Sequence, residues 1–375
     1  MRELQLMLSV FQVGILEQDA FEVVCLIRVW NNMLAPINKI PPEVLSLVPD
    51  FWNMRNRDQD IITLTHVCRA WREVSVSQTS LWTNFDCLDR EKIRVCFERS
   101  KPCPINLSLD LNGAWNPSFQ IIPHATGRLE PLSIEGPSDN LEVVAFHLSH
   151  PAPLLKHFSI RSSLGYMSDH YPALPSALFN GDLSSIRTLS LYSVHTELPW
   201  RDIVNLTSFI LSYTPPGVPS IERLLEFFEN APYLKQVGLY SVTPTARAQN
   251  GRLVSLARPK SMHIDEENLA SILLDHLLIP VGVKLEIQAN MFSPSIRVHL
   301  PRSLDNLKNF LNFTTIQLHV DGPSSGMKFS GPNRTVSMIF NDVPRDYTAV
   351  ALESLAELNT SKTERLEIGC ECLVQ

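Results

Sequence analysis

The stretch "SSIRTLSLYS" at residues 184–193 places Ile186, Leu189 and Leu191 among polar residues. Leu189 and Leu191 alternate with polar neighbours, which is the period-two pattern of a short strand with one buried face. Ile186 stands three residues before Leu189, ahead of this alternation. We therefore expect one short strand here, with its leucines directed into a core that other parts of the chain must cover.

The same spacing, an apolar residue followed by apolar residues three and five positions later, recurs along the chain. Further full copies lie at Leu129/Leu132/Ile134, Leu155/Phe158/Ile160, Leu206/Phe209/Leu211, Leu234/Val237/Leu239 and Phe313/Ile316/Leu318. Shorter copies, which keep the final pair, lie at Met262/Ile264, Leu285/Ile287, Val336/Met338 and Leu366/Ile368. Successive starts in the first five full copies are 20 to 31 residues apart, close to the period of about 20 to 29 residues in leucine-rich repeats.

Some intervals between these predicted strands carry a helix candidate, such as "PSIERLLEFFENAPYL" at 219–234. One strand with its helix cannot bury its apolar face alone, so neighbouring units must stack into a solenoid. We therefore expect an α/β fold in which residues 102–375 form a leucine-rich-repeat-like solenoid. A closed α/β domain with irregularly spaced strands is the alternative, because the copies lack the Asn position of the repeat and differ in length.

The composition limits the classes of partner. The chain has 375 residues, 44% of them apolar, which suits two or three domains or a small module with an elongated array. Its net charge of -7 provides no positive field for nucleic acid or anionic lipid. The seven cysteines are odd in number and include no Cys-x-x-Cys pair, so free thiols in a reducing compartment, cytoplasmic or nuclear, are expected. We expect a protein partner, and neither nucleic acid nor a membrane.

Residues 1–35 form an N-terminal extension to which the sequence assigns no role. The segment "LQLMLSVFQVGIL" at 4–16 is apolar like the core of a signal peptide, but Gln5, Gln12 and the acidic "EQD" at 17–19 interrupt it. No segment approaches the roughly 18 to 20 uninterrupted apolar residues of a membrane span. One or two helical stretches are expected, ending at the turn signal "NNMLAPIN" at 31–38.

Residues 36–101 have a helical pattern in three parts. The stretch "IPPEVLSLV" at 40–48 places two prolines at a helix start, where a missing N–H is harmless. A second helix is expected from Asp60 onward. Its apolar residues follow steps of three, four and three along one helical face, at Ile61, Leu64, Cys68 and Trp71. A third helix is expected in "DREKIRVCFERSK" at 89–101.

The reactive side chains of the second predicted helix do not form a catalytic pair. Cys68 and His66 are two positions apart, so they point about 200° away from each other on a helix. Arg69 and Arg72 are expected near the C-terminus of the helix, where its dipole favours cations. These residues therefore need no ligand to explain them.

Three other arrangements resemble sites of chemistry but are incomplete. The match "GPSSG" at 322–326 fits G-x-S-x-G around Ser324, but the sequence after it does not predict the helix that a nucleophile elbow requires. A solvent-exposed turn is the simpler interpretation. His147 and His150 lack the glutamate of a zinc motif, and a loop before Pro151 explains them. Cys370 and Cys372 lack two further metal ligands. We therefore expect no enzyme, no cofactor and no metal.

Three short motifs occur in order between Ile40 and Trp82. They are Ile40-Pro41-Pro42-Glu43-Val44-Leu45, Val67-Cys68-Arg69-Ala70-Trp71-Arg72 and Leu81-Trp82. Together they resemble an F-box, whose pattern is Leu-Pro-x-Glu, then Val-Cys-x-x-Trp on a second helix, then Leu-Trp. The chain is similar to the F-box-like proteins of mushroom-forming fungi, which continue into degenerate leucine-rich repeats. Two departures are the isoleucine in place of the first leucine and the long, polar link "PDFWNMRNRDQD" at 49–60.

The resemblance implies a small all-helical F-box at residues 36–101 and a substrate-binding repeat domain at 102–375. It implies the substrate-recognition subunit of a Skp-cullin-F-box (SCF) ubiquitin ligase, which binds a Skp-type adaptor and through it a cullin. The adaptor-binding residues carried over are Ile40, Pro41, Pro42, Glu43, Val44, Leu45, Val67, Cys68, Trp71, Leu81 and Trp82. Trp71 is expected to be mainly internal and residues 41–45 mainly interfacial. A repeat scaffold without a ligase role is the alternative, and in either case the repeats hold an unknown protein.

Overall fold

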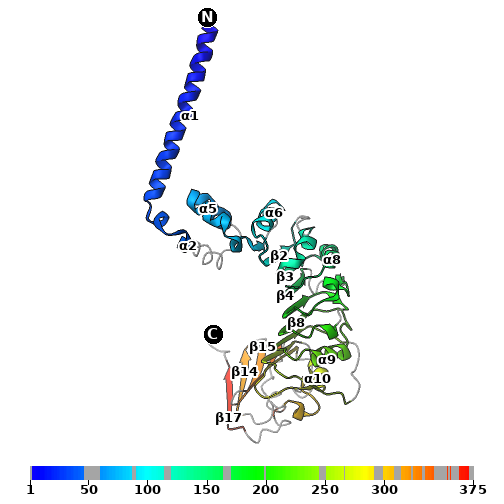
Figure 1. Ribbon diagram of the computed structural model, residues 1–375. Helices are drawn as coiled ribbons and strands as arrows, with labels where there is room; N and C mark the ends of the chain where they lie inside the picture. The colour runs from blue at the N-terminus through cyan, green and yellow to red at the C-terminus, as the bar shows by residue number, and fades with distance from the viewer. Residues whose placement is uncertain are drawn as a thin grey trace. The chain divides into compact units, whose positions relative to one another are not determined.

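A computed structural model of the chain (Figure 1) describes residues 2–45, 60–86, 90–113, 120–163, 170–197, 200–244, 251–265, 267–290, 299–307, 314–321, 324–331, 334–341, 353, 355 and 363–370. The chain forms two compact units. The first comprises residues 1–86 and 91–103, and the second comprises residues 87–90 and 104–375. The fold is mixed α/β, with an N-terminal helix and a large, mostly parallel sheet, which confirms the predicted class.

The first unit begins with a single long helix, α1 (Arg2–Leu34). The helix ends inside the predicted turn because Ala35 precedes a proline and takes an extended conformation, with φ -63° and ψ 131°. A 3-10 helix, η1 (Pro36–Lys39), follows. Neither α1 nor any other helix in the described part of the chain is long and apolar enough to span a membrane.

The rest of the first unit's described residues form short helices and a short strand, so the expectation that residues 36–101 are all-helical is not met. The helices are α2 (Pro42–Leu45), α4 (Asp60–Val67), α5 (Arg69–Ser77), η2 (Thr79–Trp82) and α6 (Arg90–Arg99), with the short strand, β1 (Asn84–Asp86), before α6. The predicted helices at 40–48 and 89–101 therefore correspond to α2 and α6. Residues 46–48 lie outside the described part of the chain.

The second predicted helix is broken in two, which corrects the expectation of one continuous helix. Cys68 separates α4 from α5 in an extended conformation, with φ -160° and ψ 177°. Leu64 and Trp71 nevertheless form one buried cluster, with Ile40, Cys68 and Val74 packed against it. Two short helices that fold onto one core leave the same apolar spacing as one continuous helix, so the spacing alone could not reveal the break.

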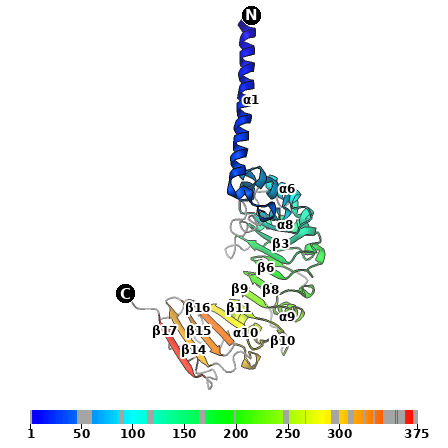
Figure 2. The same cartoon turned by 60° about the vertical axis from the view of Figure 1, so that its left-hand side comes forward.

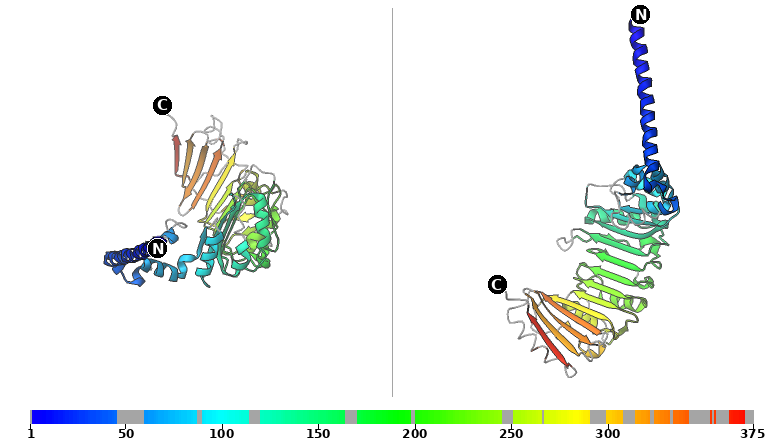
Figure 3. Two further views of the ribbon diagram at one scale, coloured as in Figure 1. Left: turned by 90° about the horizontal axis from the view of Figure 1, so that it is seen from above. Right: turned by 90° about the vertical axis from the view of Figure 1, so that its left-hand side faces the viewer.

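The second unit is built on strands that follow one another in parallel. They are β2 (Ile105–Asp110), β3 (Leu129–Gly136), β4 (His157–Ser162), β6 (Thr188–Tyr192), β8 (Ser208–Ser212), β9 (Gln236–Tyr240), β11 (Ser261–Asp265) and β13 (Lys284–Asn290). Each pairs with the next in this order, and Figure 3 shows them side by side. Two small parallel pairs lie outside this sheet: β5 (Ala173–Leu174) with β7 (His195–Thr196), and β10 (Val254–Ser255) with β12 (Leu277–Leu278).

The recurring apolar pairs explain this sheet. In register, one buried row runs through Leu132, Phe158, Leu189, Phe209, Val237, Met262 and Leu285, and a second through Ile134, Ile160, Leu191, Leu211, Leu239, Ile264 and Ile287. Every side chain in both rows is at most 4% exposed. The period-two reading of these copies therefore predicts both the strands and the face that they bury.

Helices cover this buried face (Figure 2). They are α8 (Ser138–His147), α9 (Ile221–Asn230) and α10 (Glu267–Leu274), of which α9 occupies the predicted helix at 219–234. Ser220 caps α9 by accepting a hydrogen bond from the Arg223 N–H at 3.4 Å. The ring of Phe227 on α9 lies 4.6 Å from that of Phe209 on β8. The apolar side of α9 therefore completes the core that β8 and β9 begin.

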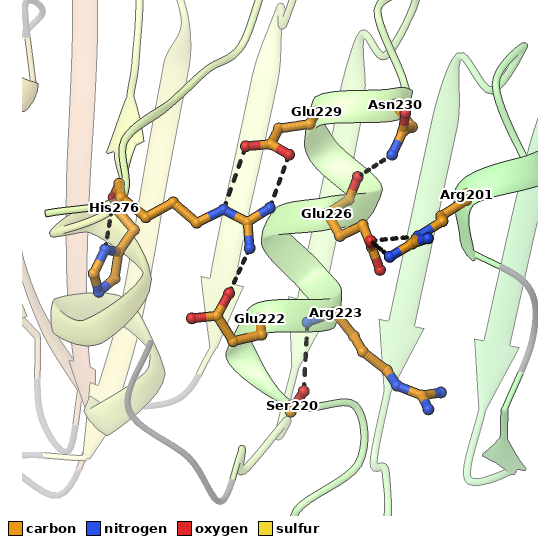
Figure 4. Close-up of polar contacts among 9 residues, drawn as sticks. Arg201, Ser220, Glu222, Arg223, Glu226, Glu229, Asn230 and His276 are labelled. Atoms are coloured by element: carbon orange, nitrogen blue, oxygen red, sulfur yellow. Dashed lines mark hydrogen bonds and ion pairs between the residues drawn. The ribbon is translucent and has the colours of Figure 1, made fainter. Parts of the chain in front are cut away.

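The outer side of α9 is acidic and is tied to its neighbours (Figure 4). Arg252 forms ion pairs with both Glu222 and Glu229, which are two turns apart on the helix. Arg201, in the 3-10 helix η7 (Trp200–Asp202), pairs with Glu226. Each of these contacts joins α9 to a segment at least 23 residues away in sequence, so they link the helix to neighbouring segments of the unit.

The end of the sheet departs from the predicted succession of repeats. After β13 the order is β16 (Arg334–Asn341), β15 (Ser324–Gly331), β14 (Thr315–Asp321) and β17 (Arg365–Cys370). Here β15 is antiparallel to both of its neighbours, whereas β14 and β17 are parallel. The copies at 316/318, 336/338 and 366/368 are thus strands, but they are not consecutive members of one array. Phe313 lies outside the described residues.

The last copy also fails to bury its apolar pair. Leu366 is 50% exposed and Ile368 is 53% exposed, whereas their partners in register on β14, Ile316 and Leu318, are buried. Alternation predicts a strand, but whether a strand is covered depends on the segments that pack on it.

Candidate functional site

The described residues of the three motifs between Ile40 and Trp82 divide into a buried set and an exposed set. Trp71 is 7% exposed, Leu81 0% and Trp82 2%. Val44 on α2 is 49% exposed and Val67 at the end of α4 is 53% exposed, while Pro41 and Glu43 are also exposed. Ile40 and Cys68 are intermediate and pack against the Leu64–Trp71 cluster. Pro42 and Leu45 belong to α2, but their side chains lie outside the described part of the chain.

The Leu81–Trp82 pair forms a second small core within the same unit. Val95 and Cys96 of α6 pack against the pair. The Trp82 indole N–H donates a hydrogen bond of 2.7 Å to the Ser75 carbonyl on α5, and the Arg99 guanidinium lies 4.3 Å from the centre of the ring. Trp82 thus links α5 to α6, so its role in this structure is internal.

The break at Cys68 changes the position of the nearby charges. Arg69 is the first residue of α5 and Arg72 lies in its first turn, so the expectation that they lie at a helix C-terminus is wrong. Arg69 forms an exposed ion pair of 2.9 Å with Glu73. Arg72 instead donates from Nε to the Thr65 carbonyl in the last turn of α4, at 2.7 Å. The cation therefore stabilises the end of the preceding helix, where the carbonyl groups carry partial negative charge.

The incomplete chemical motifs remain scattered. Ser324 is the first residue of β15, so a strand follows it where a nucleophile elbow requires a helix. His147 is the last residue of α8 rather than part of a loop. Cys370 ends β17, and Cys372 lies outside the described residues. Nowhere in the part of the chain that the structure covers do three or more His, Cys, Asp or Glu side chains gather in a way that could hold a metal.

A second candidate surface lies on the side of the sheet opposite its buried rows, which we call the open face. Its residues alternate with the buried ones and form three rows in register. The middle row is Ser133, Ser159, Ser190, Ile210, Gly238, His263 and Glu286. The flanking rows are His157, Thr188, Ser208, Gln236, Ser261 and Lys284 on one side and Glu135, Arg161, Tyr192, Ser212, Tyr240, Asp265 and Gln288 on the other.

A pocket of ≈ 290 Å³ opens on this face across β8, β9, β11 and β13. Its lining includes Tyr240, His263, Lys284 and Glu286 around Gly238. The glycine is required by a close approach, because a Cβ atom at this position would lie 2.7 Å from Cε2 of the Tyr240 ring. The tyrosine therefore lies over the strand backbone and forms one wall of the pocket.

The polar groups of the pocket are connected to one another. The rings of Tyr240 and His263 stack with their centres 4.6 Å apart. His263 Nδ1 lies 3.5 Å from Glu286 Oε1, and Lys284 Nζ lies 3.4 Å from Glu286 Oε2. His263 Nε2 is buried and has no hydrogen-bond partner among the described residues. One carboxylate thus serves two basic groups, both through contacts longer than a good hydrogen bond.

The surroundings of Tyr240 disfavour ionisation of its hydroxyl. Burial raises the pKa of the Tyr240 hydroxyl, and nearby Tyr192, Glu286 and Asp265 raise it further. Burial also raises the pKa of the Asp265 carboxyl, against the opposing effect of His263. On the same face, the Arg161 guanidinium lies 4.1 Å from the centre of the Tyr192 ring. The open face therefore combines tyrosine rings with carboxylates, and one of these rings already binds a guanidinium.

This pocket is not among the sites predicted from the sequence, although the sequence contains a signal for it. Its central residues occupy the position between the two apolar residues of successive copies, as Gly238 does between Val237 and Leu239. Alignment of the copies on their apolar pairs would have brought these intervening residues together. Comparisons of the chain with protein-family models, with curated proteins and with solved structures find no match.

Proposed function

We propose that this chain is the substrate-recognition subunit of an SCF-type ubiquitin ligase. On this proposal the short helices of residues 36–101 are an F-box that binds a Skp-type adaptor, and through it a cullin. Residues 102–375 form a leucine-rich-repeat-like solenoid that holds a protein substrate. The chain positions this substrate for a transfer reaction to which it contributes no chemistry.

The observation that carries the proposal is the exposure of valines next to a complete but small core. Leu64 and Trp71 are buried, while Val44 and Val67 remain about half exposed. Small helical modules bury a limited share of their surface when they fold. Exposed apolar side chains beside such a core are typical of a surface that a partner covers.

The regular parallel strands support the second half of the proposal. Seven of them, from β3 to β13, present their apolar pairs to one core, with helices on that side. The open face is left free of helices in the described residues and is lined with polar and aromatic side chains. Stacked repeats commonly use such an extended face to bind another protein.

Capture of a Skp-type adaptor by the full-length chain tests the proposal. Val44→Asp and Val67→Asp place a charge on the proposed interface, so each should reduce capture at least tenfold, because an unpaired charge would be buried there. Val143→Asp is the matched control, since Val143 is 41% exposed on α8 in the other unit. Failure of the folded wild-type chain to capture the adaptor, or equal capture by all three variants, would overturn the proposal.

A repeat scaffold without a ligase role is the second candidate. It is favoured by the burial of Trp71, Leu81 and Trp82, because these side chains serve the core of the unit itself. Large aromatic anchors often dominate interface energetics, and these tryptophans are not exposed to supply one. A chain that binds a protein through the open face while it captures no adaptor would support this candidate.

A further inference from the structure

The pocket on the open face has features that select a particular kind of side chain. Its walls are the Tyr240 ring and the stacked His263 ring, and its floor is the backbone at Gly238. Glu286 lies in the lining, and Asp265 stands next to Tyr240 in the same row. Aromatic faces together with carboxylates attract cations, and a planar guanidinium suits both.

We propose that this pocket binds an arginine side chain from an extended segment of the substrate protein. The guanidinium donates to Glu286 and lies against the stacked His263 and Tyr240 rings, while the peptide runs across the neighbouring strands of the open face. This inference rests on the proposed function for its partner, since it names the class of substrate that the repeats hold.

Charge complementarity supports a basic occupant. Glu286 lies in the lining and Asp265 lies beside Tyr240 in the flanking row. Two carboxylates therefore stand in or next to the pocket, together with the ammonium group of Lys284 and the imidazole of His263. The Lys284 side chain is 61% exposed and its contact with Glu286 is 3.4 Å. A loose, exposed pair of this kind contributes little energy, so Lys284 can move aside when a guanidinium takes its place.

The same face already shows the geometry that the proposal requires. Arg161 on β4 places its guanidinium 4.1 Å from the centre of the Tyr192 ring. Tyr192 and Tyr240 occupy the same row, separated by Ser212 on β8. An incoming arginine at Tyr240 would repeat this arrangement two strands further along. The small Ser208 and Ser261 side chains in the lining leave room for the peptide beside it.

Selection from a display library of random nonapeptides, with the purified full-length chain as bait, tests the inference. The expected result is enrichment of arginine at one position. Resynthesised with lysine or with neutral citrulline at that position, the selected peptide should bind about tenfold more weakly in fluorescence anisotropy, because the bidentate charged contact is lost.

Substitutions that are expected to change the affinity for the peptide in opposite directions distinguish a binding role from a purely structural one. Glu286→Gln should weaken the arginine peptide about tenfold, and Tyr240→Ala about threefold to tenfold. Lys284→Ala should instead tighten it about threefold, because a competing cation is removed. A purely structural role for these residues would not produce gains and losses together. Glu135→Gln and Lys328→Ala, exposed residues on β3 and β15 away from the pocket, are the matched controls and should leave the affinity unchanged.

Several results would overturn the inference. They are the absence of arginine enrichment, enrichment of acidic or phosphorylated residues, and an affinity that Glu286→Gln leaves unchanged. The selection uses the chain without any adaptor, so its outcome is independent of adaptor capture. A chain that captures the adaptor but selects no arginine refutes this inference alone, whereas arginine selection without adaptor capture refutes the ligase role alone.

Discussion

His299 should make the stability of the sheet unit depend on pH. Its side chain is 0% exposed, and neither ring nitrogen has a hydrogen-bond partner among the described residues. Its ring lies 5.5 Å from that of Phe340 on β16, beside the buried Leu300 and Pro301. Burial lowers the pKa of this imidazole from 6.5 to about 4, because the charged form cannot be solvated there.

The sign and size of the effect follow from this lowered pKa. Below pH 6.5 the unfolded chain binds a proton at His299 that the folded chain does not bind until about pH 4. Above pH 6.5 His299 is largely neutral in both states and does not lower the free energy of unfolding. As the pH falls from 6.5 towards 4, protonation of the unfolded chain lowers the free energy of unfolding progressively. Between pH 7 and pH 5 the free energy of unfolding should fall by about 2 kcal/mol from this residue.

Urea unfolding of the full chain, monitored by the circular dichroism signal of the sheet, measures this loss. His299→Leu keeps a similar volume and removes the titrating group, so the variant should be less sensitive to pH than the wild type by about 2 kcal/mol between pH 7 and pH 5. His150→Leu, at an exposed position, is the control and should keep the wild-type pH dependence. Equal pH dependence in the wild type and in His299→Leu would refute the reasoning.

Two further substitutions test the packing. Trp82→Phe removes the donor to the Ser75 carbonyl and should lower the free energy of unfolding by about 2 kcal/mol, as measured by urea denaturation; wild-type stability would contradict the internal role of Trp82. Gly136→Ala should cost about 1 to 3 kcal/mol, because its Cβ atom would lie 2.6 Å from that of Leu111. Gly113→Ala, with no atom within 4 Å of the added Cβ, should be nearly neutral in the same urea denaturation, and equal free energies of unfolding for the two variants would argue against the close contact.

The strands and their buried face could be predicted because both follow from local alternation. Leu189 and Leu191 are two residues apart, so any strand that contains them places both on one side. The pairing of strands is different, since it depends on residues far away in sequence. Nothing between Thr315 and Asp321 indicates that β14 pairs with β15 and β17 instead of with β13. The exposure of Leu366 likewise depends on what packs against β17.

In the helical unit, too, the sequence predicts which residues share a core but not the path of the backbone. The helical spacing of Leu64 and Trp71 correctly predicts that they share a core, because they do so on either side of the break at Cys68. The positions of the charged side chains relative to the helix ends, however, depend on the path of the backbone. Arg72 therefore lies at the start of one helix while it binds the end of another, an arrangement that a single helical wheel cannot represent.

The pocket could have been predicted from the sequence only once the pairing of the strands was known. Gly238, His263 and Glu286 occur 25 and 23 residues apart in the chain, yet they are direct neighbours in register. Once parallel pairing is known, the residue between two buried apolar positions must face outward on every strand, and its neighbours are its counterparts in adjacent copies. A glycine in that row makes room for the tyrosine two residues later. A repeating strand thus allows the outward residues to vary while the buried pair is kept, and this is why the open face can carry a specific site on a regular core.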